Sequence, residues 1–251
     1  MRKPLVLGNW KMHGTVGEIR SLLLELIKAR KTLSQVEVCV CPPFVFLPLV
    51  TGLCAGSAIR IGAQNVSQHK NGAFTGEISG SMLAELGAEY VLVGHSERRE
   101  FFGESSEIVA QKFVAAQEQG LVPVLCLGET LEQRERGKTE ETVLAQLDTV
   151  ISIAGTGALA SSVLAYEPIW AIGSGKTASP AQAQQVHRML REHIAVRDSV
   201  VAKALRILYG GSVHETNAKM LFVQPDIDGG LVGGASLNPE QFAAICASME
   251  F

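Results

Sequence analysis

The sequence predicts an α/β protein, built as a single parallel eight-stranded (β/α)8 barrel over residues 1–251. Apolar runs of strand length recur eight times, segments with helical spacing separate them, and no linker or change of composition divides the chain. Each unit then has about 31 residues, close to a minimal β–α repeat. We therefore expect one domain, with an open doubly wound sheet as the alternative.

The strand-like runs are apolar almost throughout, instead of alternating between apolar and polar residues. Parallel strands covered on both faces show this pattern, because neither face meets water. In the second run Cys39 and Cys41 are two residues apart, so we expect them on one face as small buried side chains. The predicted strands are residues 5–8, 37–41, 59–63, 90–94, 123–127, 163–166, 206–209 and 230–232.

Five segments between these runs have apolar residues spaced for one face of a helix. They are residues 17–30, 107–119, 139–153, 181–196 and 239–249. The last has a clear start signal, with Asn238 as N-cap, Pro239 at the first helical position and Gln241 three residues beyond the cap. In the first, the apolar stripe consists of Ile19, Leu22, Leu23, Leu26 and Ile27.

Composition and charge exclude several classes of protein. The chain has 22 basic and 25 acidic side chains, a net charge of −3, without the positive surplus of a nucleic-acid binder. No uninterrupted apolar stretch approaches the roughly 18 residues that suggest a membrane span. Five cysteines without a C-x-x-C pair, and histidines without a metal-binding spacing, predict neither disulfides nor a metal site. We expect a cytoplasmic protein that binds no nucleic acid, membrane or metal.

Polar residues follow several predicted strands, at the carboxyl ends where barrels of this class carry their active sites. Asn9 and Lys11 follow the first strand, and in an extended segment they would point the same way. His95 follows the fourth strand and Glu167 the sixth. Each alone is more typical of a solvated charge or a turn. Together on one rim, they predict a catalytic site with a cation, a histidine and a carboxylate.

Glu167 has a further signal in the next residue. Pro168 disfavours the α region for the residue before it, and so keeps Glu167 extended where it leaves the sixth strand. A carboxylate held in one place suits a general base.

Glycine-rich segments follow the sixth, seventh and eighth strands. Closely spaced glycines let backbone N–H groups approach an anion, and barrels often bind phosphate after strands seven and eight. Gly173, Ser212, Gly233 and Gly234 are therefore candidate phosphate donors, with simple tight turns as the alternative.

Two nucleotide-binding patterns in the same region are incomplete. Gly175-Lys176-Thr177 resembles the end of a P-loop, but Trp170 stands where that motif needs glycine. Residues 173–178 fit G-x-G-x-x-A, yet six residues separate them from the strand, where a dinucleotide-binding turn would follow directly. We therefore expect no nucleotide cofactor.

Five motifs, in order along almost the whole chain, together resemble the triosephosphate isomerase family. They are N-W-K-M at 9–12, G-H-S-E-R-R at 94–99, Y-E-P-I-W-A-I-G at 166–173, Y-G-G-S at 209–212 and V-G-G-A-S at 232–236. The resemblance implies a TIM barrel. It also implies an aldose–ketose isomerase of glycolysis and gluconeogenesis that interconverts dihydroxyacetone phosphate and D-glyceraldehyde 3-phosphate through an enediol(ate), without a cofactor.

The same resemblance implies roles for the site residues. Glu167 is the base that moves the proton between adjacent carbons, His95 polarises the carbonyl, and Lys11 binds the anionic substrate. Asn9 helps to orient the substrate. The implied phosphate donors are Gly173, Ser212, Gly233 and Gly234.

Two loops have further implied roles. Residues 171–175 have the composition of a lid that excludes water. This chain has Ser174 where the family usually has threonine, and we expect the difference to affect the rate of lid movement more than the activity. Residues 64–79 form a polar connection longer than compact domains usually contain. The resemblance implies that this connection enters a second subunit of a homodimer, with Thr75 near Asn9 and His95 of the partner subunit. A plain surface loop is the alternative.

Two other functions fit a barrel with this rim. One is a Schiff-base aldolase that uses Lys11, which borohydride trapping with substrate would detect. The other is a phosphometabolite-binding or scaffold protein, which would not exchange substrate hydrogen with deuterated solvent.

Overall fold

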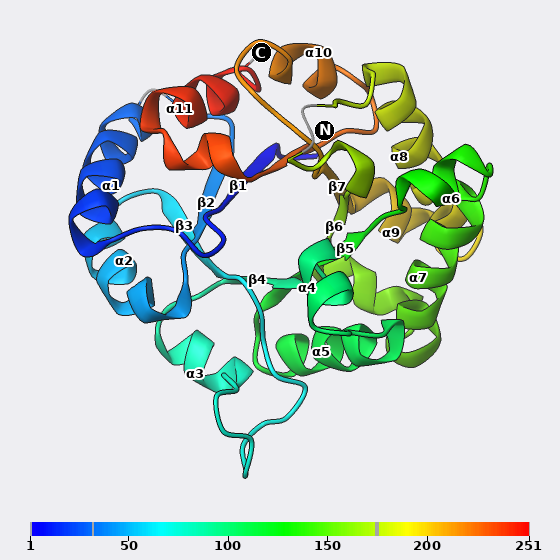
Figure 1. Cartoon of the computed structure of the whole chain (residues 1–251), viewed down its shortest axis with the longest axis horizontal. Helices are drawn as coiled ribbons and strands as arrows, with labels where there is room; N and C mark the ends of the chain where they lie inside the picture. The colour runs from blue at the N-terminus through cyan, green and yellow to red at the C-terminus, as the bar shows by residue number, and fades with distance from the viewer. Residues whose placement is uncertain (1, 32, 174–175, 251) are drawn as a thin grey trace.

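Eight parallel strands pair in sequence order around a closed barrel, with the helices outside (Figure 1). This computed structural model describes residues 2–31, 33–173 and 176–250. The strands are β1 (Leu5–Asn9), β2 (Glu37–Cys41), β3 (Ile59–Ala63), β4 (Tyr90–Val93), β5 (Val122–Leu127), β6 (Val163–Tyr166), β7 (Arg206–Tyr209) and β8 (Gly229–Val232). The predicted fold class is confirmed. The doubly wound alternative is wrong, because β1 pairs with both β2 and β8 and closes the ring.

The predicted strand ends agree with the structure to within one residue. β4 stops one residue early because Gly94 adopts a positive φ of 70°, which turns the chain out of the strand.

The five predicted helices are present as α1 (Val16–Arg30), α5 (Ser106–Glu118), α7 (Thr139–Ala154), α8 (Pro180–Ala195) and α11 (Pro239–Ala247). The predicted cap of α11 is confirmed, since Asn238 Oδ1 accepts the Gln241 N–H at 3.0 Å. In the predicted stripe of α1, Ile27 is only partly buried, whereas Ile19, Leu22, Leu23 and Leu26 are buried.

Further helices are too short to show a periodic stripe in the sequence. They are α2 (Leu47–Cys54), α3 (Gly80–Glu85), α4 (Ser96–Phe101), α6 (Leu131–Glu135), α9 (Ser199–Ala204) and α10 (Ala218–Phe222). Short 3₁₀ helices are η1 (Phe44–Phe46), η2 (Thr156–Ser161), η3 (Ile169–Ala171) and η4 (Gly234–Leu237). Within the described ranges, no helix has the length and apolar character needed to cross a membrane.

The apolar core has two layers. The larger layer lies between the strands and the helices, and the smaller one fills the barrel. Cys39 and Cys41 belong to the inner layer, so the prediction that they share a buried face is confirmed. The inner layer also contains Leu5, Leu7, Tyr90, Leu92, Val124, Cys126, Val163, Ala165, Leu208 and Leu231.

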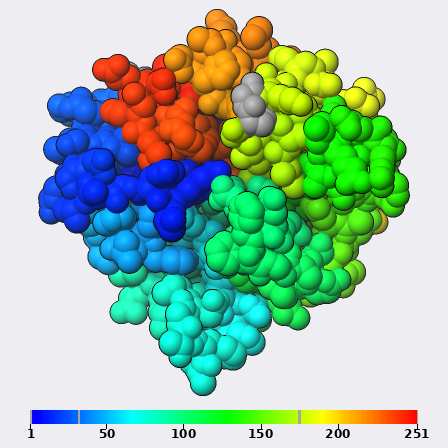
Figure 2. Space-filling view, in the orientation of Figure 1, coloured from blue at the N-terminus to red at the C-terminus, as the bar shows by residue number. Residues whose placement is uncertain are grey.

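The connection between β3 and α3, residues 64–79, extends away from the barrel (Figure 1), and Figure 2 shows it as the cyan protrusion at the lower edge. It contains neither helix nor strand. Near its tip, the rings of His69 and Phe74 stack with centroids 3.8 Å apart. Phe74 nevertheless stays 42% exposed.

The dense inner layer predicts that Gly62→Ala destabilises the fold. A Cβ at this position would lie 2.5 Å from Cys41 Sγ, whereas one at Gly157 would meet nothing within 4 Å. Neither glycine has a positive φ, so Gly157→Ala is a matched control. We expect Gly62→Ala to cost about 1–3 kcal/mol and to lower the melting temperature, measured by circular dichroism. Equal melting temperatures for the two variants would contradict this packing.

Candidate active site

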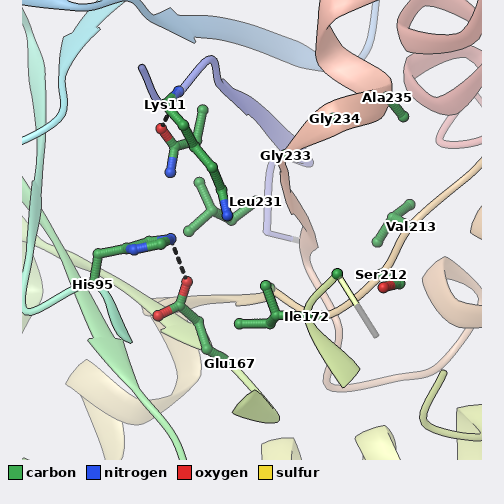
Figure 3. Close-up of a pocket in the computed structure, with 14 residues that line it drawn as sticks. Lys11, His95, Glu167, Ile172, Ser212, Val213, Leu231, Gly233, Gly234 and Ala235 are labelled. Carbon is green, nitrogen blue, oxygen red and sulfur yellow. Dashed lines mark hydrogen bonds and ion pairs between the residues drawn. The ribbon is translucent and has the colours of Figure 1, made fainter. Parts of the chain in front are cut away.

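One pocket at the carboxyl ends of the strands brings together the eight site residues predicted from the sequence. It has a volume of about 250 Å³. Figure 3 shows His95, Glu167 and Lys11 converging on it, with Ser212 across from His95. The eight residues are Asn9, Lys11, His95, Glu167, Gly173, Ser212, Gly233 and Gly234.

Backbone bonds on both sides hold Glu167 at the end of β6. Its N–H donates to Leu127 O at 2.7 Å, and Gly210 N–H donates to Tyr166 O, also at 2.7 Å. A Cβ on Gly210 would lie 2.8 Å from Glu167 Cγ, so glycine there leaves room for the acidic side chain. Glu167 is consequently only 2% exposed.

The Glu167 carboxylate bonds to the start of α4. Its Oε1 lies 3.0 Å from His95 Nε2 (Figure 3), and its Oε2 accepts the Ser96 N–H at 2.9 Å. Burial by itself raises the pKa of Glu167, but the bonds from His95 and Ser96 outweigh burial and bring the pKa below its usual value. Glu167 is therefore a carboxylate at neutral pH, the form that a general base requires.

His95 is the N-cap of α4, and its two ring nitrogens have different partners. Nδ1 accepts the Glu97 N–H at 3.3 Å, which leaves the ring proton on Nε2, facing Glu167. Burial lowers the pKa of His95 and the Glu167 carboxylate raises it, with a net increase. A second ring proton would displace the Glu97 amide and meet the positive end of α4. The raised pKa and the Glu97 carboxylate, 3.6 Å from Nδ1, favour a charged ring, but Nδ1 cannot carry a proton while it accepts the Glu97 N–H. On this hydrogen bond we assign a neutral imidazole with its proton on Nε2.

Lys11 lies in a turn, so the prediction that Asn9 and Lys11 share an extended segment is wrong. β1 ends at Asn9, and Lys11 has a φ of 51°, the only positive φ among the described non-glycine residues. Two bonds support this conformation: Asn9 Oδ1 accepts the Lys11 N–H at 3.1 Å, and Gln64 Nε2 donates to Lys11 O at 2.8 Å. Such strained backbone is typical of functional sites.

The Lys11 ammonium pairs with Glu97, with Nζ 2.6 Å from Oε1. The Lys11 side chain is partly exposed and bonded to a carboxylate, whereas the lysine of a Schiff-base aldolase is normally desolvated. The geometry therefore disfavours the aldolase alternative.

The candidate phosphate donors lie after β6, β7 and β8. Gly234 begins η4, whose first N–H groups have no acceptor within the turn and suit an anion. The Ser212 N–H and hydroxyl both donate to Ala171 O, at 3.1 and 2.5 Å. Ser212 therefore links β7 to the predicted lid. Ser174 and Gly175 lie outside the described residues, so the prediction about Ser174 is untested.

Two residues in contact with the site had no predicted role. Glu97 pairs with Lys11. It lies only two residues after His95, and this position in the sequence could have indicated that it belongs to the site. Gln64 supports the Lys11 backbone from the base of the 64–79 connection. No local sequence signal indicates this second contact, because the two residues meet only through the fold.

The sequence is similar to those of known proteins. A family model described as triosephosphate isomerase matches residues 4–249. The triosephosphate isomerase of Dechloromonas aromatica is 57% identical over 246 residues, 98% of each chain. That of Thiobacillus denitrificans is 56% identical over 246 residues, also 98% of each chain. That of Pseudomonas aeruginosa PAO1 is 56% identical over 250 residues, again 98% of each chain.

The contacts of His95 predict a single tautomer at neutral pH. We expect ¹⁵N NMR of the histidine-labelled protein at pH 7 to show a protonated Nε2 and an unprotonated Nδ1 for His95. The His95→Gln variant assigns the signals. Two protonated ring nitrogens at pH 7 would contradict a neutral imidazole.

Proposed function

This chain belongs to the triosephosphate isomerase family, and we propose that the pocket described above is its active site. The chain is a triose-phosphate isomerase, a glycolytic enzyme that interconverts dihydroxyacetone phosphate and D-glyceraldehyde 3-phosphate. One observation carries the assignment of the site. A buried carboxylate base and an imidazole N–H face each other over 3.0 Å, in a pocket whose other wall is rich in backbone N–H groups.

In the proposed mechanism, substrate enters between Glu167 and His95. The substrate carbonyl oxygen takes the place of the carboxylate as acceptor for His95 Nε2–H. Glu167 is then free to remove a proton from the carbon next to that carbonyl and to return it to the former carbonyl carbon. His95 Nε2 gives its proton to the carbonyl oxygen and takes one from the neighbouring hydroxyl, so that the ring ends neutral. A general base of this kind contributes about 10²–10⁴-fold to the rate.

Negative charge develops on the enediolate oxygen, and the pocket holds groups that stabilise it. Lys11 supplies a positive charge, and the His95 N–H donates a hydrogen bond. Each preorganised donor of this kind contributes about 10²–10³-fold. Asn9 orients the substrate and braces the Lys11 turn through the bond of Asn9 Oδ1 to the Lys11 N–H.

The substrate phosphate occupies the opposite side of the pocket in this proposal. Gly173, Gly233 and Gly234 offer backbone N–H groups there. The Ser212 N–H and hydroxyl also donate to the phosphate once their hydrogen bonds to Ala171 O are broken. This exchange would couple phosphate binding to the position of Ala171, the last residue of η3.

We further propose that residues 1–251 form one domain and that the protein is cytoplasmic. The pairing of β1 with β8 supports a single domain, because it joins the two ends of the chain in one sheet. The five cysteines, all within the described ranges, are free and buried, which suits a reducing compartment.

We propose that the protein is a homodimer held by residues 64–79. The projecting connection carries the exposed Phe74. The helix α4 ends at the exposed Phe101, and the exposed Phe102 follows it. Met12, next to Lys11, is 93% exposed. Large apolar side chains at the surface support an interface. Thr75 of one protomer would then lie near the partner's Asn9 and His95.

The base assignment predicts that Glu167→Asp lowers turnover strongly. The shorter side chain withdraws the carboxylate by one methylene, and a displacement of about 1 Å can cost 10²-fold in rate. We expect kcat to fall about a hundredfold or more, with an unchanged melting temperature. Release of hydrogen from the substrate carbon to deuterated solvent should fall in parallel. The exposed Glu132→Asp is the control, and near-normal kcat for Glu167→Asp would overturn the assignment.

The dimer predicts a sedimentation mass of about twice 26.8 kDa at micromolar concentration. Thr75→Arg places a charge in the proposed interface, so we expect it to sediment as a monomer with reduced kcat. A fully active wild-type monomer would contradict the proposal.

A further inference from the structure

Gln146, in the middle of α7, makes two bonds to one residue at the barrel rim. Its Oε1 accepts the Gly128 N–H at 2.9 Å, and its Nε2 donates to Gly128 O at 2.9 Å. Gly128 directly follows β5. The side-chain amide therefore bonds both polar backbone groups of this residue, just past the strand. Gln146 does not line the substrate pocket.

The backbone of Glu167 lies directly against Gly128. A Cβ on Gly128 would lie 1.8 Å from Glu167 O, so no larger residue fits while Glu167 keeps its place. On either side of this contact, Glu167 N–H donates to Leu127 O at 2.7 Å and Ile169 N–H donates to Glu129 O at 3.1 Å. Residues 127–129 are thus the surface on which the Glu167 backbone rests.

At Gly128, in the middle of this surface, the backbone is bonded by a side chain instead of a neighbouring strand. The paired register of β5 and β6 ends at Leu127 and Tyr166, so Gly128 lies beyond the strand ladder. Its N–H and C=O still need partners, and Gln146 supplies both. The helix that carries Gln146 is itself held firmly, because Val143, Leu147 and Val150 are fully buried against the barrel.

We propose that Gln146 is a positioning residue for catalysis: by clamping the backbone of Gly128, it fixes the place of Glu167 at the end of β6. This inference rests on the proposed role of Glu167 as the base. Gln146 touches neither the substrate nor the reacting atoms. Its effect passes through the Gly128 backbone to the Glu167 backbone, and from there to the carboxylate.

Gln146→Met tests the clamp, because methionine has a similar length and volume but forms neither bond. We expect kcat to fall about ten- to a hundredfold, since small displacements of a base are costly. KM should change less than about threefold, because the phosphate donors after β7 and β8 do not contact Gln146. Steady-state kinetics in both directions of the reaction give the two constants.

Gln117→Met is a matched control. Gln117, on α5, also bonds the backbone through its amide, with Nε2 donating to Ala158 O at 2.7 Å and Ser161 O at 3.2 Å. These carbonyls lie before β6, away from the catalytic end. We expect both variants to melt at a lower temperature, and only Gln146→Met to lose kcat.

Gln146→Glu is a second test of the clamp, and it can be used even if Gln146→Met fails to fold. A carboxylate still accepts the Gly128 N–H, but its second oxygen would face Gly128 O, another acceptor. We therefore expect kcat to fall at least as far as in Gln146→Met, again with KM nearly unchanged. Any of three results would overturn the proposal. The folded Gln146 variants could keep a kcat within about twofold of wild type, Gln117→Met could lose as much kcat as Gln146→Met, or the Gln146 variants could change KM alone. If the kcat of Glu167→Asp is also near normal, the proposed role of Glu167 as the base fails. If only Glu167→Asp is impaired, the clamp alone is wrong.

Discussion

Closure of the sheet between β1 and β8 is the constraint on which the whole site depends. It places Asn9 and Lys11, near one end of the chain, beside Gly233 and Gly234, near the other. The closure is tight: Gly229 begins β8 with a φ of 139°, and a Cβ there would lie 1.9 Å from Leu5 O. Without this junction, the lysine and the proposed phosphate donors would not face the same pocket.

Charge in the pocket is balanced locally. The buried Glu167 carboxylate accepts bonds from His95 and Ser96, and Lys11 pairs with Glu97. Each charge therefore has a partner before substrate arrives, which limits the cost of burying it. An anionic substrate is recognised by one lysine and by backbone N–H groups in the proposed mechanism. This explains how a chain with a net charge of −3 can act on a phosphate ester without a basic surface.

The sequence was sufficient to predict most of the fold and eight of the residues that line the pocket. Strand bounds were predictable because apolar runs and glycine turns are local features. Short helices such as α4 were not, since six residues are too few for a periodic signal. The turn at Lys11 was also missed. Its backbone is held by Asn9 and by Gln64, and the second of these partners comes from a distant part of the chain.

The sequence by itself determined the repeated β–α order, the residues that follow each strand, and the absence of a basic or metal-binding pattern. Only the tertiary structure decided the partners: Glu97 for Lys11, His95 for Glu167, and Gln146 for Gly128. The physical reason is the distance along the chain over which each kind of interaction acts. Periodicity and turn chemistry act between near neighbours in the chain, whereas a hydrogen bond between two loops exists only after barrel closure sets their separation and orientation.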